Sequence, residues 1–189
     1  MRDPALPFQW RVSALRSCVQ LYKPLGFQAT LSYLEAKAGR FQREEAALLQ
    51  ALALVEASRA ARQVAVQAYA ARRREAKKRG RRVPGTREID PNVQARFYWY
   101  GAPREAALFA LWFWREHRSF ELTSVELVEC VEKRLRATAG QHDSLVVRIR
   151  EVESRLQSWE LLQVVRHVEV ALGLWTDSGL IRTGAVAIS

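Results

Sequence analysis

The stretch 46-AALLQALALVEASRAARQVAVQAYAARRREAKKRG-80 predicts one long helix that ends in a block of positive charge. Eleven alanines lie between residues 46 and 71, with no Gly or Pro among them, and Ala is the strongest helix former. The first apolar stripe falls at helical spacing, at Leu48, Leu52 and Val55. A narrower continuation is expected at Val64, Ala68 and Ala71. We expect the helix to continue through the arginines to Gly80, so that its last two turns form a cationic rod.

Positive charge is concentrated at the end of this helix and just after it. Residues 72–82 hold eight Lys or Arg and one Glu, and six of the eight cations are Arg. The wider segment 62–96 has eleven cations against three anions, so it carries +8 of the chain's net charge of +10. Arg pairs bidentately with phosphate, and clustered cations bind nucleic acid by releasing its counterions. We therefore predict a phosphate-backbone contact here, while an acidic protein partner, a targeting signal and a solvated face stay open.

The candidate nucleic-acid-binding residues are the cations of this block and two arginines further along the chain. They are Arg72, Arg73, Arg74, Lys77, Lys78, Arg79, Arg81, Arg82, Arg87 and Arg96. Phosphate contacts of this kind give affinity and salt dependence but carry no base specificity.

Three regions are predicted along the chain. Residues 1–82 form a helical region that ends in the basic helix, with two shorter helices before it, over 8–22 and from about 28 to Gly39. The segment 83–96 contains two prolines and a glycine and reads as a linker. Residues 97–189 form a Trp-rich helical domain. The predicted fold class is therefore mostly α, a helical bundle with one long cationic helix.

The second half supplies further helices to this bundle. The helix that opens at Pro103 is apolar nearly all round, which is typical of a helix buried inside a bundle. Thr123 and Glu126 form a capping box at the start of the next helix, which Gly140 closes. Amphipathic patterns over 143–159 and 161–175 predict two more helices, followed by a short β-hairpin at the C-terminus.

The order of elements over residues 103–189 resembles a winged helix–turn–helix module. The resemblance implies a recognition helix with candidates at Gln163, Arg166 and His167, and a wing with candidates at Arg182 and Thr183. Interfaces that read DNA are strongly positive, whereas residues 97–189 have a net charge of −1. We therefore favour a module that docks protein or supports the basic half over one that reads DNA directly.

Four consecutive aromatic residues follow Arg96 and begin the second half. Phe97-Tyr98-Trp99-Tyr100 could stack on unpaired bases, and Tyr98 and Tyr100 are the candidates for that role. Four adjacent side chains point in several directions, so we favour the alternative in which they anchor the linker to the core and the Tyr hydroxyls reach solvent.

The sequence offers little support for catalysis. His117, His142 and His167 are isolated, and Cys18 and Cys130 form no metal-ligand or redox spacing. A Gly-rich phosphate loop and a nucleophile elbow are both absent. We predict a protein that is not an enzyme and needs no cofactor and no metal. No signal peptide or membrane-spanning run is seen, so the expected setting is cytoplasmic, without a membrane partner or a small-molecule substrate.

The predicted function is non-catalytic binding of nucleic acid, RNA or DNA, as a small helical subunit of a nucleoprotein assembly with other protein subunits. One alternative is a DNA-binding regulator whose C-terminal winged module reads sequence. Another is a scaffold subunit whose basic helix docks an acidic protein. The sequence leaves open the choice between RNA and DNA, the oligomeric state and the pathway.

Overall fold

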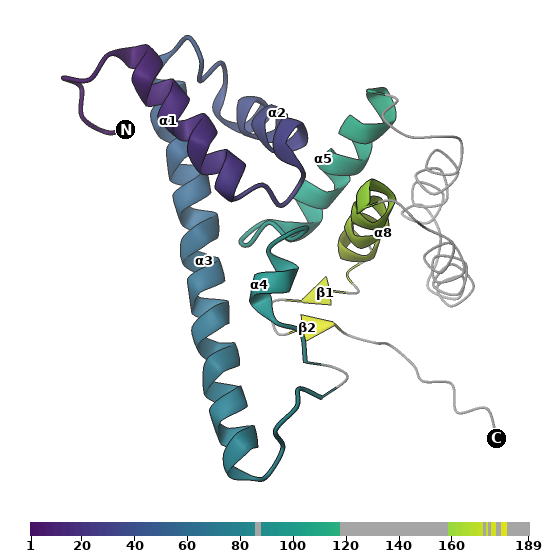
Figure 1. Ribbon diagram of the computed structural model, residues 1–189. Coiled ribbons are helices and arrows are strands. Elements are labelled where there is room, and N and C mark those ends of the chain that lie inside the picture. The colour runs from purple at the N-terminus through teal and green to yellow at the C-terminus, as the bar shows by residue number, and fades with distance from the viewer. Residues whose placement is uncertain (86–87, 118–158, 172, 174, 177–178, 181–189) are drawn as a thin grey trace.

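Helices make up most of the described chain in the computed structural model, which covers residues 1–85, 88–117, 159–171, 173, 175–176 and 179–180 (Figure 1). The helices are α1 (Phe8–Leu21), α2 (Phe27–Ala38), α3 (Glu45–Lys78), α4 (Pro91–Gln94), α5 (Pro103–Glu116) and α8 (Trp159–Ala171). Strands β1 (Trp175–Thr176) and β2 (Gly179–Leu180) pair antiparallel, with Trp175 opposite Leu180. The expectation of a mostly helical chain is confirmed.

Helix α3 is 34 residues long, so it spans about 51 Å and extends well past its neighbours (Figure 1). Its first half is buried against α1 and α2, and the predicted stripe of Leu48, Leu52 and Val55 lies in the core. The predicted continuation of that stripe is wrong. Val64 is 66% exposed, and Ala68 and Ala71 are exposed too. The reason is that α1 and α2 cover only the first half, so the alanine-rich second half owes its helicity mainly to propensity.

Helix α5 packs between α2 and α8 and divides its apolar residues between two core clusters. Ala106, Ala110 and Phe113 face the cluster formed with α1, α2 and the first half of α3. Ala107 and Leu111 face the cluster formed with α8. The prediction of a helix buried inside the bundle is confirmed only in part: both core clusters cover α5, but Glu105, Trp112 and Glu116 lie on one face of it and are exposed.

The cluster around α1 and α2 also takes in Trp99, from the far side of the predicted linker. The Trp99 ring is 3% exposed and lies 5.1 Å from the ring of Tyr33 and 6.1 Å from that of Tyr22, centroid to centroid. Residues from both sides of the linker therefore share one core.

The segment predicted as a linker contains a helical turn, α4, that the sequence reading missed. The Asp90 carboxylate accepts a hydrogen bond from the backbone N–H of Asn92 at 2.8 Å, and Pro91 occupies the first helical turn. An Asp followed by Pro is a typical start for a helix, so the signal was present in the sequence.

Several sequence-based expectations concern segments outside the described residues. The predicted helix over 123–140, most of the predicted helix over 143–159 and the last nine residues belong to this group. The last described helix, α8, ends at Ala171, four residues before the predicted end.

Replacing Trp99 with Ala should lower the free energy of unfolding by about 3–5 kcal/mol, because the ring fills a fully packed site between α1 and α2. The matched control is Trp112→Ala, which removes a ring that is half exposed and should cost about 1 kcal/mol. Urea unfolding followed by circular dichroism measures both. Equal losses for the two variants would contradict the shared core.

Candidate nucleic-acid interface

The end of α3 is set by a glycine and two backbone hydrogen bonds. Gly80 adopts a positive φ of 78°, which an L side chain rarely takes. The N–H of Arg81 donates to the carbonyl of Ala76 at 2.9 Å, and the N–H of Gly80 donates to that of Lys77 at 3.0 Å. These two bonds form a Schellman motif, so the helix carries the basic block to its last turn as predicted.

One member of the block, Arg73, is buried and serves the fold. Its residue exposure is 8%, and its guanidinium donates to Glu88 at 3.1 Å and to the carbonyls of Arg81 and Arg82 at 3.3 and 2.9 Å. Ala76, one turn further on, is also buried. This side of α3 is therefore covered by the segment that returns from the helix end, and the Arg73 guanidinium is occupied by it.

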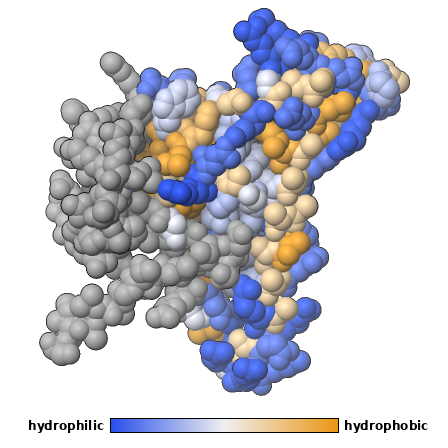
Figure 2. Space-filling model, turned by 180° about the vertical axis from the view of Figure 1, so that it is seen from behind, coloured by the Kyte–Doolittle hydropathy of each residue, from blue (hydrophilic) through white to orange (hydrophobic). Residues whose placement is uncertain are grey.

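The other seven cations of the block are exposed, and we call them the basic tip: Arg72, Arg74, Lys77, Lys78, Arg79, Arg81 and Arg82. With 3.6 residues per turn, those on the helix spread around every side that Arg73 and Ala76 leave uncovered. Glu75 is the one anion between residues 72 and 82, and it pairs with Lys78 at 2.8 Å. Figure 2 shows mostly hydrophilic side chains at the lower end of the molecule, where α3 ends.

Two predicted members of the phosphate track do not join the basic tip. Arg87 lies outside the described residues. Arg96 is exposed but follows α4, and its backbone carbonyl accepts a hydrogen bond from the side-chain amide of Gln163 in α8 at 3.4 Å. The structure thus brings the block together at one helix end and places Arg96 in a different environment.

The aromatic tetrad is buried. Tyr98 and Tyr100 are 1% and 2% exposed, and their rings contact each other edge to face at 5.0 Å. The Tyr100 hydroxyl donates inward, to the carbonyl of Pro91 at 3.3 Å and the side chain of Gln94 at 3.1 Å, so it does not reach solvent as we had expected. In this conformation neither ring presents a face to a base, and the tetrad anchors the chain to both core clusters.

The candidates on α8 are held by contacts within the protein. His167 is fully buried, and its Nε2–H donates to the carbonyl of Pro24 at 3.1 Å, because a carbonyl can only accept. Gln163 contacts the Arg96 carbonyl, and Arg166 pairs with Glu169 at 2.7 Å. Arg182 and Thr183 lie outside the described residues. Of the predicted recognition helix, the structure therefore shows one residue inside the core and two partly buried.

The burial of His167 also changes its proton affinity. Burial lowers the pKa of this imidazole from 6.5 to about 4, although the carbonyls of Pro24 and Gln163 act in the opposite direction by favouring the protonated ring. His167 is therefore neutral in the folded protein at neutral pH.

The described residues show neither a metal cluster nor a membrane-spanning helix. They contain no group of three or more His, Cys, Asp or Glu side chains that could hold a metal ion. No helix among them is long and apolar enough to cross a bilayer.

Sequence reasoning missed two sets of residues that shape this part of the molecule. Glu88 is the ion-pair partner of Arg73, and nothing in the spacing of the two residues announces the pair. A pocket between α1, α3, α4 and α8 gathers Lys23, Arg62 and Asn92 from distant parts of the sequence, so no local pattern could have found it.

Comparison with known proteins adds no family to this geometry: no protein-family model, no curated protein and no solved structure matches the chain.

Arg73→Gln and Arg74→Gln form a matched pair of neighbours that each remove one positive charge. Arg73→Gln should lower the free energy of unfolding by about 1.5–3 kcal/mol, because it leaves Glu88 and two carbonyls without their donor. Arg74→Gln should change it by less than about 0.5 kcal/mol, since the side chain is exposed. Urea unfolding of both variants tests this assignment, which fails if Arg74→Gln is the more destabilising.

The buried His167 should make stability fall in mild acid. Its pKa is about 4 in the folded state against 6.5 when unfolded, so its contribution is complete above pH 6.5 and is lost as the pH falls toward 4. The loss should reach about 3 kcal/mol, and it should be absent from His167→Gln, whose side-chain amide can still donate to Pro24. Urea unfolding between pH 7 and 4, with an NMR titration of the wild-type ring, measures it; a native His167 pKa near 6.5 would contradict the assignment.

Proposed function

We propose that the protein binds the phosphate backbone of nucleic acid through the basic tip, without catalysis, as a helical subunit of a nucleoprotein assembly. The observation that carries the proposal is the arrangement of seven exposed cations around one helix end with a single carboxylate among them. Ordinary solvated helix faces mix charges of both signs, with Glu and Lys at four-residue spacing. Here the cations outnumber their partners, and a polyanion would neutralise them.

The helical geometry supports contact with a phosphate backbone rather than with base edges. Long Arg and Lys side chains that radiate around one helix end can reach several phosphates at once. The end of the helix also carries the negative end of its dipole, which stabilises these cations in the absence of a partner. No base-reading residue is needed, so the proposed binding is governed by charge and salt.

The alternative of a sequence-reading regulator has less support. It would place Gln163, Arg166 and His167 on an open recognition surface, whereas His167 is fully buried and Arg166 pairs with Glu169. The winged module itself remains a proposal, because much of the segment that would form it lies outside the described residues. A scaffold that docks an acidic protein on the basic tip is separated from nucleic-acid binding by the experiment below.

Binding should depend steeply on salt, and removing cations from the basic tip should flatten that dependence. The test variant changes four exposed arginines to Gln: Arg72, Arg74, Arg79 and Arg82. The slope of log Kd against log salt should fall in magnitude by up to about four for duplex DNA, since each phosphate contact contributes about 0.9. Single-stranded RNA, single-stranded DNA and duplex DNA are compared by fluorescence anisotropy, and the preferred polymer identifies the target.

The control variant removes the same charge elsewhere, at four exposed arginines of the N-terminal half: Arg16, Arg40, Arg43 and Arg59. It should keep most of the wild-type slope. Equal slopes for the two variants would reject the basic tip as the contact. Absence of binding to all three polymers at low salt would reject the function and favour the acidic protein partner.

A further inference from the structure

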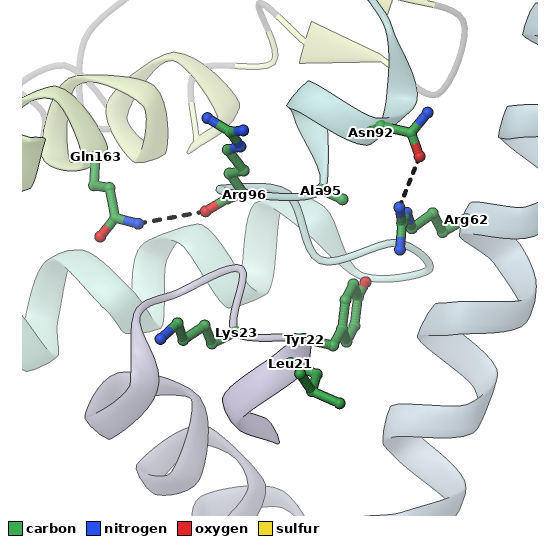
Figure 3. A pocket seen from close by; sticks show the side chains of 8 residues that line it. All are labelled: Leu21, Tyr22, Lys23, Arg62, Asn92, Ala95, Arg96 and Gln163. Carbon is green, nitrogen blue, oxygen red and sulfur yellow. Dashed lines mark hydrogen bonds between the residues drawn. The ribbon is translucent and has the colours of Figure 1, made fainter. Parts of the chain in front are cut away.

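A pocket of about 330 Å³ opens between the end of α1, the middle of α3, α4 and α8 (Figure 3). Its size falls in the range of small-molecule sites, at the lower end of roughly 300–1,000 Å³. The lining residues are Leu21, Tyr22, Lys23, Arg62, Asn92, Ala95, Arg96 and Gln163. The basic tip lies elsewhere, because Arg62 precedes Arg72 by ten residues, or about 15 Å along α3.

The described residues that line the pocket include three cations and no acidic side chain. Figure 3 shows Arg62 entering from α3 at one end of the lining and Lys23 at the other, with the Lys23 ammonium directed away from Arg62, while the side chain of Arg96 extends away from Lys23. Lys23 is exposed, and Arg62 is partly buried. Lys23 and Arg62 therefore place positive charge at two ends of the same pocket, although they lie 39 positions apart in the sequence.

Arg62 is held in place by a hydrogen bond to α4. One of its terminal nitrogens donates to the side-chain carbonyl of Asn92 at 2.8 Å. Its Nε is buried and has no hydrogen-bond partner among the described residues. That nitrogen has almost no accessible surface, so an anionic oxygen that entered the pocket would be favoured by the charge of Arg62 and by its terminal nitrogens rather than by Nε.

The rest of the lining suits a ligand with polar edges and a flat apolar face. The side-chain amides of Asn92 and Gln163 lie at opposite ends of the pocket (Figure 3), and each is already oriented by a hydrogen bond within the protein. Leu21 is 90% exposed at the rim, which is unusual for a side chain of this type and leaves an apolar surface for a planar group. The Asn92 amide is engaged at both ends, by Arg62 and by the Asp90 carboxylate. The cations, the Gln163 amide and the apolar rim are the groups that match the phosphate, base edge and base face of one nucleotide.

We propose that this pocket binds a phosphate monoester carried by a nucleotide, either a free mononucleotide or the 5′-terminal nucleotide of a nucleic acid. Lys23 and Arg62 bind the phosphate. Binding of a 5′-terminal nucleotide rests on the nucleic-acid binding proposed above, whereas binding of a free mononucleotide does not. The pocket would then give the protein a preference for a chain end, which the basic tip alone cannot provide because backbone phosphates are alike along a strand.

The test uses the full chain and three single-charge variants, with adenosine 5′-monophosphate and adenosine as probes in isothermal titration calorimetry. The monophosphate should bind at least about tenfold more tightly than adenosine, and Lys23→Gln and Arg62→Gln should each weaken it about tenfold. Arg16→Gln, an exposed change on α1, is the charge-matched control and should bind like wild type. Lys23 is exposed, so Lys23→Gln keeps the test informative if Arg62→Gln fails to fold.

A second arm compares single-stranded oligonucleotides that carry a 5′-phosphate or a 5′-hydroxyl, to separate the two sources. Binding of the monophosphate that depends on Lys23, with no difference between the two oligonucleotides, supports a free nucleotide. A 5′-phosphate preference that disappears in Lys23→Gln supports the chain end. The proposal is overturned if the protein distinguishes neither the monophosphate from adenosine nor the 5′-phosphate from the 5′-hydroxyl oligonucleotide. It is also overturned if Arg16→Gln loses as much affinity for the monophosphate as Lys23→Gln and Arg62→Gln do.

The two proposals fail in distinguishable ways. The four-arginine variant of the basic tip should weaken both oligonucleotides equally, whereas Lys23→Gln should remove only the difference between them. If the monophosphate still binds and the basic-tip variant changes binding to no polymer, the pocket proposal stands and the backbone contact is rejected.

Discussion

Arg73 donates hydrogen bonds to Glu88 and to the carbonyls of Arg81 and Arg82, and these bonds hold the returning segment against a helix end with almost no apolar core beneath it. A buried guanidinium is stable only when such partners compensate for its lost hydration. The contact closes one side of the helix end and leaves the other sides to the seven cations of the basic tip. The direction in which those cations face therefore depends on this one set of hydrogen bonds.

Along α3, most residues that pack into the core lie in the first half, and most of the exposed cations lie near the C-terminal end. Apolar packing against α1 and α2 fixes the first half of the helix, and Trp99 extends that core across to the segment that leads into α5. The second half is held mainly by its alanine content and by the Schellman motif at Gly80. Exposed cations can be concentrated there because only Arg73 and Ala76 of that block are buried. The pocket beside Arg62 lies where the packed half gives way to the exposed one.

Much of the fold could be predicted from local patterns, because those patterns act over one or two helical turns. The helical spacing of Leu48, Leu52 and Val55 and the terminating role of Gly80 are of this kind. The exposure of Val64 depends on where neighbouring helices end, and the burial of Arg73 depends on a partner fifteen residues away, so neither could be predicted. The same holds for the pocket, which is assembled from four separate elements. The four adjacent aromatics left base stacking open for Tyr98 and Tyr100 but favoured an anchoring role, and their rings lie in the core.

Lysine footprinting can show whether the basic tip contacts nucleic acid, because the chain contains few lysines and two of them, Lys77 and Lys78, belong to the basic tip. The protein is acetylated under limiting reagent with and without saturating nucleic acid, and mass spectrometry gives the modification at each site. We expect Lys77 and Lys78 to become protected while Lys37, which pairs with Glu105 on another face, keeps its reactivity. Unchanged acetylation of Lys77 and Lys78 in a saturated complex would contradict it.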